Sequence, residues 1–515
     1  MSAATPSPSP VAERSAALDD RSFFGHPRGL GLLFAAEMWE RFSYYGMRAL
    51  LVLYLVNELG WEKARATGLY GTYTMLVFLT PIVGGFLADR LIGTRRSLVL
   101  GGAIIAAGHF VLAFPGMTAF YAGLGLVIVG TGLFKPNVST MVGQLYPAND
   151  TRRDAGFTFF YMGINLGAFL GPLVCGYLAA SPQFGWHWGF AAAGVGMVLG
   201  LIAFVVWRDR LLPGIGLPTP RALASAGTES SGANMNPMHG IVGVLGGVAL
   251  AWLVADGSPL ALLVGAIIGG AFGASFLGTV GEERMRVIAL FIVAFFVVFF
   301  WAAYEQQGSS FALFFDRSTN RQMGSFEIPS AWSQSINPFF VLAFSPVMAW
   351  VWLRLGAMRR EPSTSLKMVL GLALLGAGFM VLQVGGALAD GGVKVSPAWL
   401  VVAIGLQSIG EVCVSPVGLS YVTKVAPAQF ASLLMGVWFL SNAAANKVSG
   451  FLAGFTPLPG EAPATPGTGL VGWIQEMSAT NKGFFTIFVI SSFAAAALMF
   501  LCVPLLKRLT RTVQA

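Results

Sequence analysis

Fourteen apolar segments constrain this chain more than any other feature of its sequence. A helix needs about 20 consecutive apolar residues to cross a lipid bilayer, and the segments fall into groups of six, two and six. The first six segments are residues 30–55, 66–87, 98–114, 120–142, 157–179 and 188–207. The middle pair is 241–254, which is short and Gly-rich, and 260–280. The last six segments are 288–315, 331–353, 368–388, 399–422, 433–455 and 484–506.

The composition agrees with a chain that lies mostly in lipid. Hydrophobic residues make up 55% of the sequence and charged residues only 10%, whereas soluble domains carry about 25% charged residues. An ordinary soluble protein is therefore excluded. The three cysteines and four histidines are scattered, so neither a disulfide framework nor a metal site is expected. No secretory signal peptide is recognised at the beginning of the chain.

The basic residues predict the orientation. If the first residue is cytoplasmic, most of the 31 Lys and Arg residues fall in cytoplasmic loops and tails, as the positive-inside rule requires. We therefore expect a multi-pass protein of the cell (inner) membrane, with 14 transmembrane helices and both termini cytoplasmic. The net charge of +8 then reflects topology, and no nucleic-acid partner is expected.

The two sets of six segments resemble each other weakly. Tyr161 and Asn165 stand four residues apart in the fifth segment, and Trp438 and Asn442 repeat that spacing in the eleventh of the twelve. A duplicated six-helix unit suggests alternating access around a site near the membrane midplane. The expected parts are a disordered tail (1–28), a six-helix bundle (29–208), a linker (209–240), an inserted helix pair (241–281), a second six-helix bundle (282–508) and a tail (509–515).

Eight ionisable residues fall inside the expected spans, and their charges sum to zero. An ionised group in the hydrocarbon costs roughly 2.5–3.5 kcal/mol on insertion scales, so such residues are functional candidates. For any one of them, the alternative is a structural ion pair between helices. The residues are Glu37, Glu40, Glu305, Glu411, Arg41, Arg48, Lys135 and Lys447. Lys447 is expected to pair, but the sequence does not identify its partner.

The first segment carries the most informative pattern. Glu37, Arg41, Tyr44 and Arg48 follow one another at steps of four, three and four residues, which places them on one helical face. Guanidinium groups bind carboxylates through paired donors, so this face is suited to an anionic group. The alternative is a helix held to its neighbours by polar contacts.

Acids close to bases in a low-dielectric cavity also suggest proton movement. Glutamates near Arg41 and Lys135 can exchange a proton as their charged partners rearrange. Lys135 precedes Pro136, and a proline within a helix frees a backbone carbonyl where a polar cavity or hinge can form. The spans contain no nucleophile with a base, so an enzyme is not expected.

These residues resemble the motifs of a known family. Glu37, Glu40, Arg41, Tyr44 and Tyr45 stand in a segment similar to the ExxERFxYYG signature of the proton-coupled oligopeptide transporter (POT/PTR) family, bacterial type, within the major facilitator superfamily. The segment around Tyr161 and Asn165 resembles its FYxxINxG signature, and those around Lys135 and Glu411 resemble its helix-4 and helix-10 patterns. The resemblance implies the major facilitator fold: two six-helix bundles, here with two additional helices between them.

The resemblance also implies roles. Arg48, Lys135 and Tyr44 would receive the carboxylate of a peptide, and Glu411, Asn165 and Asn337 its ammonium group. Side-chain pockets and gates would be lined by Tyr45, Tyr161, Trp301, Trp438 and Ser415. The proton-coupling network would contain Glu37, Glu40 and Arg41, and Glu305 would pair with Arg48 when the transporter closes.

Two positions depart from the family pattern. Gly71 stands where mammalian members have a histidine, so protons would have to use carboxylates, and Phe78 stands where a tyrosine commonly lines the site. The expected function is proton-coupled import of di- and tripeptides by alternating access. The alternative is a related symporter for nitrate or another small organic anion. Protons would be the coupling ion, no other cofactor is implied, and no obligatory protein partner is predicted.

Overall fold

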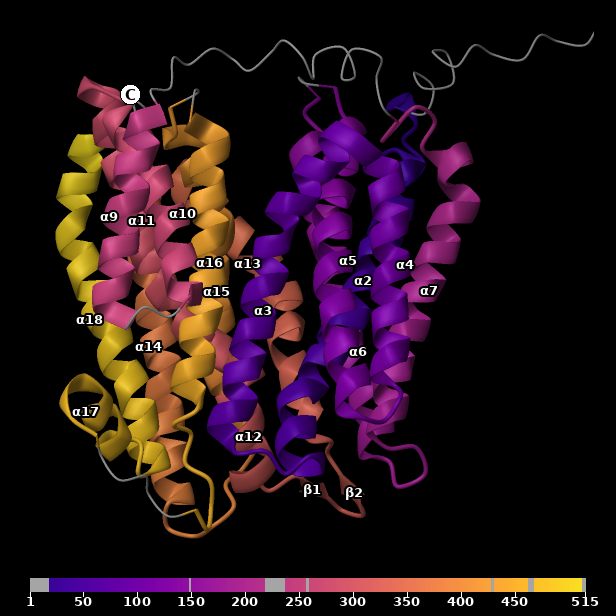
Figure 1. Cartoon of the computed structure of the whole chain (residues 1–515), viewed down its shortest axis with the longest axis vertical. Coiled ribbons are helices and arrows are strands. Elements are labelled where there is room, and N and C mark those ends of the chain that lie inside the picture. Colours follow the sequence, from indigo (N-terminus) through magenta and orange to yellow (C-terminus); the bar gives the residue numbers. More distant parts are fainter. Residues whose placement is uncertain are drawn as a thin grey trace, which may run out of the picture. The chain divides into compact units, whose positions relative to one another are not determined.

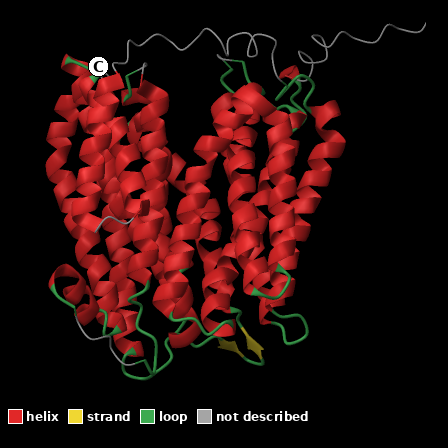
Figure 2. Ribbon diagram, viewed as in Figure 1, coloured by secondary structure: helices red, strands yellow, loops and turns green. Residues whose placement is uncertain are grey.

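The fold is almost entirely helical (Figures 1 and 2). The structure is a computed structural model, and it describes residues 18–147, 150–217, 237–255, 259–427, 430–461 and 467–511. Three parts of the predicted organisation lie outside the described residues: most of the expected first tail, residues 218–236 of the expected linker, and the last four residues of the expected second tail. The prediction of an all-α membrane-type architecture is confirmed.

A helix lies at each of the fourteen predicted segments. The first six helices are α2 (Arg28–Leu53), α3 (Lys63–Leu87), α4 (Thr94–Leu112), α5 (Met117–Gln144), α6 (Arg153–Ala180) and α7 (Trp186–Leu211). The middle pair is α9 (Pro237–Ala255) and α10 (Pro259–Leu277). The last six are α11 (Gly281–Tyr304), α13 (Ile336–Ala357), α14 (Thr364–Ala389), α15 (Ala398–Val425), α16 (Ala431–Ala453) and α18 (Asn481–Leu509).

Ten helices in the described part of the chain are long and apolar enough to cross a membrane. The apolar stretches of α9 and α10 are shorter, at Pro237–Trp252 and Leu262–Leu277. Helices dominate because an α-helix pairs its backbone N–H and C=O groups internally, which lipid cannot do for them. That all fourteen helices cross the membrane stays a prediction.

One predicted helix is interrupted. The segment predicted at 288–315 consists of α11, a 3₁₀ turn η3 (Glu305–Gly308) and the short helix α12 (Ser310–Ser318). Side chains supply hydrogen bonds to the backbone at this break: Gln306 Nε2 donates to the Ala302 carbonyl at 3.2 Å, and Ser310 Oγ donates to the Gln306 carbonyl at 3.3 Å. Irregular backbone at membrane depth requires partners of this kind.

The remaining short elements lie next to the long helices. They are π-helical turns η1 (Tyr54–Glu58) and η2 (Ala88–Ile92), a 3₁₀ segment η4 (Ser330–Ser335) and helix α17 (Gly469–Met477). Strands β1 (Gln322–Met323) and β2 (Phe326–Glu327) form an antiparallel hairpin in which Gln322 faces Glu327 and Met323 faces Phe326.

The chain forms two compact units. The first contains Met1–Leu59, Leu79–Thr228 and Ile328–Leu342, and the second contains Gly60–Phe78, Glu229–Glu327 and Ala343–Ala515. Helices α3 and α13 therefore each contribute one part to each unit.

In the first unit, α2 packs against α6 and α7, and α4 packs against α5 and α7. The core between these helices is apolar, and Leu33, Leu98, Phe134, Met141 and Phe204 are completely or almost completely buried within it. The apolar side chains of α2 thus pack within this core. Its polar residues meet α5 and α6, which also contribute candidate site residues.

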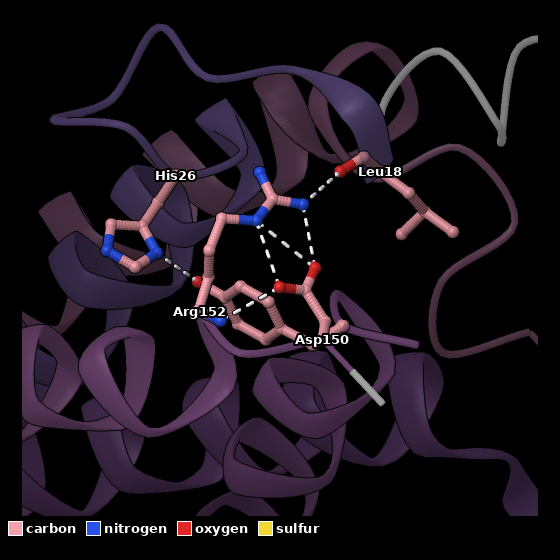
Figure 3. Close-up of polar contacts among 5 residues, drawn as sticks. Leu18, His26, Asp150 and Arg152 are labelled. Carbon is pink, nitrogen blue, oxygen red and sulfur yellow. Dashed lines mark hydrogen bonds and ion pairs between the residues drawn. The ribbon is translucent and has the colours of Figure 1, made fainter. Parts of the chain in front are cut away.

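Polar contacts fasten the segment before α2 to the turn between α5 and α6 (Figure 3). His26 Nδ1 lies 2.9 Å from the Tyr146 hydroxyl, and His26 is buried. Arg152 Nη2 donates to Asp150 Oδ2 at 2.7 Å and to the Leu18 carbonyl at 3.2 Å. The beginning of α2 is therefore tied to the end of α5.

These contacts shift several pKa values. Burial, reinforced by the positive charge of Arg152, lowers the pKa of His26. Hydrogen bonds from Arg152 lower the pKa of Asp150 to about 2, and burial raises that of Tyr146 to about 12. At neutral pH the cluster therefore contains a neutral histidine and phenol beside an ion pair.

In the second unit, α14 packs against α15 and α18, and α11 packs against α16 and α18. Helices α9 and α10 pair closely with each other, and α10 also contacts α11 and α16. Glycines allow the close α9–α10 approach: a Cβ atom at Gly247 would lie 2.0 Å from the Gly265 carbonyl oxygen. The neighbouring Gly246 faces open space, with nothing within 4 Å of such an atom.

Alanine substitutions at these two adjacent glycines are expected to have opposite effects. Gly247→Ala should lower the unfolding free energy by about 1–3 kcal/mol through overpacking. Gly246→Ala should be neutral or slightly stabilising, because alanine favours a helix by about 0.5–1 kcal/mol over glycine. Thermal unfolding of the purified variants in one detergent measures the difference, and equal shifts in melting temperature would contradict the close α9–α10 packing.

The His26 contact predicts a pH dependence of stability. Because the folded pKa lies below the ordinary value of about 6.5, the unfolded chain binds a proton first as pH falls. The contribution of His26 to the unfolding free energy should therefore be fully present above about pH 7. It should decline as pH falls through 6.5 towards the lowered pKa of His26 in the folded state. His26→Gln should flatten this part of the curve of melting temperature against pH, whereas Tyr146→Phe should lower the melting temperature but retain the slope. An unchanged slope in His26→Gln would contradict the assignment.

Candidate functional site

A cluster of buried charges occupies the middle of α2. Arg41 Nε lies 3.0 Å from Glu37 Oε1 and 2.5 Å from Glu40 Oε2. The side chains of Glu37, Glu40 and Arg41 are 2%, 0% and 4% exposed, so water does not screen their charges. One guanidinium is thus shared between two carboxylates. We call these three residues the α2 ion cluster.

Lys135 completes the charge balance of the α2 ion cluster. Its ammonium group, on α5 directly before Pro136, interacts electrostatically with both Glu37 and Glu40. Two buried acids, a buried arginine and the half-buried Lys135 then lie within reach of one another's charge. Rearranging any one of the four charges changes the field at the other three, because interactions between charges are strong where the effective dielectric constant is low.

The tyrosines of the same helix pack onto the arginines. The Arg41 guanidinium carbon lies 5.4 Å from the centre of the Tyr44 ring, and that of Arg48 lies 5.6 Å from the Tyr45 ring. The two rings meet edge to face at 5.1 Å. These cation–π contacts fix the orientation of both guanidiniums. The face predicted from the helical spacing thus carries cations backed by aromatic rings.

Helix α6 adds amide and phenol groups to the first unit. Asn165 is buried, and its Nδ2 donates to the Tyr161 carbonyl at 3.0 Å. Asn337 lies at the beginning of α13, directly after η4, which packs on α6. Ser335 fastens this segment, because its Oγ donates to the Phe169 carbonyl at 2.8 Å. Asn165 and Asn337 therefore belong to the same compact unit.

In the second unit, the break in α11 carries the candidate residues. The Tyr304 hydroxyl donates a hydrogen bond to Glu411 Oε2 on α15. Trp301 meets the Tyr304 ring edge to face at 5.2 Å, and Glu305, buried, begins η3. The structure thus places Trp301 and Glu305 on either side of the residue that contacts Glu411.

Trp438 on α16 packs against α15. It is 5% exposed, and a Cβ atom at Gly418 would lie 2.2 Å from its ring. Ser415, four residues after Glu411 on α15, is partly buried. These two candidates therefore occupy neighbouring helices of the second unit.

Lys447, whose partner the sequence could not identify, contacts α3. Its Nζ donates to Thr72 Oγ1 at 2.7 Å, and Thr72 Oγ1 in turn donates to the Gly68 carbonyl at 2.8 Å. The adjacent Gly71 lies against Gly450 of α16, so that a Cβ atom at Gly71 would be 2.8 Å from the Gly450 Cα. A histidine at position 71 would not fit this contact, which gives a physical reason for the glycine.

The sequence did not predict the contacts of Tyr304 with Glu411 and of Thr72 with Lys447. The only signal at Tyr304 was a polar group beside Glu305 in an otherwise apolar helix, and a single aromatic residue in such a helix more often serves packing. Thr72 gave no signal, since serine and threonine hydroxyls within a helix commonly bond the carbonyl of the preceding turn. No group of three or more His, Cys, Asp or Glu residues capable of holding a metal ion occurs in the described part of the chain.

The fold and these contacts define a class of protein. Long apolar helices that bury charged side chains are typical of membrane proteins that conduct polar solutes or ions through their interior. The POT family model (PTR2) matches residues 95–211 and 264–474. The chain belongs to the POT family, as its motifs predict. Members of this family are transporters and not enzymes, which confirms the expectation from the sequence.

Relatives match over most of their length. The uncharacterized transporter YclF of Bacillus subtilis is 43% identical over 466 residues, 88% of this chain and 92% of the relative. The peptide transporter YePEPT of Yersinia enterocolitica is 37% identical and covers 84% of this chain and 89% of its own. A di-/tripeptide transporter of Lactococcus lactis is 36% identical, covering 88% and 95%.

Solved structures share the fold. The peptide transporter POT in complex with sulfate superposes with a TM-score of 0.79 at 36% identity, over 98% of this chain and 100% of that chain. A POT family transporter in complex with 5-aminolevulinic acid superposes with a TM-score of 0.77 at 30% identity, over 94% and 98%. The likeness therefore extends over nearly the whole chain.

The Lys447–Thr72 hydrogen bond predicts energetic coupling between α16 and α3. Thr72→Val and Lys447→Met should each lower the unfolding free energy, and a double-mutant cycle should give a coupling of about 1–2 kcal/mol. Thr74→Val is the matched control, because Thr74 Oγ1 donates to the Tyr70 carbonyl on the same helix at 2.9 Å. Chemical denaturation measures all variants. Additive effects of Thr72→Val and Lys447→Met, or equal coupling with Thr74→Val, would contradict the assignment.

Proposed function

We propose that this protein is a proton-coupled symporter that imports di- and tripeptides by alternating access. In this proposal all fourteen helices cross the cell (inner) membrane, and both termini are cytoplasmic. Residues 29–208 and 282–508 act as the two moving bundles, and residues 241–281 form the inserted pair. Protons are the coupling ion, and no other cofactor or obligatory protein partner is required.

The observation that carries the proposal is the α2 ion cluster. Glu37 and Glu40 share Arg41 while all three side chains are at most 4% exposed. A buried carboxylate that loses its cationic partner is more stable protonated, because an uncompensated charge in the interior costs several kcal/mol. Movement of Arg41 or Lys135 therefore obliges a glutamate to take up or release a proton, and this links proton movement to conformational change.

The substrate class follows from charges on both halves of the chain. Arg48 and Lys135, with Tyr44, supply donors suited to a peptide carboxylate. Glu411, with Asn165 and Asn337, supplies acceptors suited to an ammonium group. Relatives named as peptide or di-/tripeptide transporters support this assignment. A zwitterionic peptide has one charge of each sign at its ends, and a single inorganic anion does not.

The remaining candidates have aromatic or short polar side chains that suit peptide side chains and gates. They are Tyr45, Tyr161, Trp301, Trp438 and Ser415. Glu305 would belong to the proton-coupling network, since it would pair with Arg48 on closure and release it on opening. Proton-coupling and peptide-binding steps would then use the same arginine in turn.

Uptake into proteoliposomes tests the proposal. Labelled dialanine should accumulate under an inward proton gradient, and collapse of the gradient with a protonophore should abolish accumulation. Uptake of nitrate without uptake of dialanine would refute peptide transport in favour of an anion symporter.

Substitutions in the α2 ion cluster form the second arm of this test. Glu37→Gln or Glu40→Gln should abolish proton-driven uptake while peptide counterflow, which needs no net proton movement, survives. Glu58→Gln is the matched control, because Glu58 follows α2 in η1 and is exposed. Equal loss of uptake and counterflow in the cluster variants would indicate a purely structural role.

A further inference from the structure

Tyr304 and Glu411 join two helices of the second unit at the point where one of them is interrupted. Tyr304 is the last residue of α11, and its hydroxyl donates to Glu411 Oε2 on α15. Hydrogen bonds from O–H donors to carboxylates are short and roughly twice as strong as those between neutral groups. Such a bond fixes the carboxylate in one orientation.

The phenol itself is held firmly. Tyr304 is 7% exposed; its ring stacks on Phe300 at 5.6 Å with an interplanar angle of 18°, and meets Trp301 edge to face. Because a ring packed on two sides has little rotational freedom, its hydroxyl is held in one position, from which it donates to Glu411.

A second hydrogen bond joins the same elements one turn away. Gln307 Nε2 donates to Gln407 Oε1 at 2.9 Å. Residues 304 and 307 on one side thus meet 411 and 407 on the other, as expected for two antiparallel segments. Both glutamines are buried. These two bonds set the register of α15 against the break in α11, and with it the position of Glu411.

We propose that Tyr304 is a positioning residue for Glu411 and thereby a determinant of selectivity for peptides with an unblocked N-terminal ammonium group. The inference rests on the proposed function, in which Glu411 receives that group. A carboxylate can accept about four hydrogen bonds, so one bond from a phenol orients the group without using all of its acceptor sites. A phenol is neutral, so it orients Glu411 without cancelling the charge that attracts the substrate.

Equilibrium binding to the purified full-length protein tests this inference and does not require an active transporter. The ligands are dialanine and N-acetyl-dialanine, which differ in the ammonium group. Tyr304→Phe removes the hydroxyl but retains the ring that packs on Phe300. We expect about tenfold weaker binding of dialanine, as for the loss of a hydrogen bond to a charged group, and a change of less than about twofold for N-acetyl-dialanine.

Three further variants make the outcome decisive. Glu411→Gln should remove the preference for dialanine over the acetylated peptide, and adding Tyr304→Phe to it should cause little further loss, because both changes act on one interaction. Tyr54→Phe, which removes a buried phenol of the first unit outside the candidate site, should leave the preference unchanged.

Contrary outcomes separate the two proposals. If Glu411→Gln abolishes the preference but Tyr304→Phe weakens both ligands equally, or adds fully to Glu411→Gln, then Tyr304 serves packing alone and only this inference is overturned. If Glu411→Gln leaves the preference intact, the assignment of Glu411 to the ammonium group fails, and the role of Tyr304 fails with it.

Discussion

The shared guanidinium of Arg41 is the interaction on which the first unit depends. Glu37 and Glu40 lie within the apolar interior, where an ion without a partner costs several kcal/mol. Arg41 contacts both, and Lys135 of α5 adds the second positive charge. Helix α2 must therefore keep its polar side directed to α5 and α6 while its other sides pack on the apolar core. The charge balance thus determines the rotation of α2 about its own axis.

The break in α11 also places polar groups that need partners within the apolar interior, in this case in the second unit. A 3₁₀ turn within an apolar helix exposes backbone groups that lipid cannot satisfy. Gln306 and Ser310 donate to the backbone carbonyls of Ala302 and Gln306 at the break, while Tyr304 and Gln307 reach α15. Three of these residues also join the break to neighbouring helices: Gln306 bonds α16, and Tyr304 and Gln307 bond α15. A segment able to bend is thereby kept in register with Glu411.

The sequence predicted the helices well, because an apolar run of membrane-spanning length has few alternatives to a helix. The pairing of Glu37 with Arg41 was also predictable, since a spacing of four residues places both on one face. Contacts between segments distant in the sequence were not predictable. Lys447 and Thr72 are 375 residues apart in the sequence, and nothing in either local pattern indicates the other. The break at Glu305–Gly308 was missed because the residues on both sides are strongly apolar and favour one continuous helix.

The two units use different chemistry to hold their acids. In the α2 ion cluster, Arg41 orients the two carboxylates and, together with Lys135, balances their charge. At Glu411, the phenol of Tyr304 orients the carboxylate while adding no charge. An acid held in the first way is suited to respond to protons, and an acid held in the second way is suited to attract a cation. In the proposed transport cycle, charge balance by Arg41 and Lys135 would suit Glu37 and Glu40 to proton coupling, and orientation by Tyr304 would suit Glu411 to binding an ammonium group.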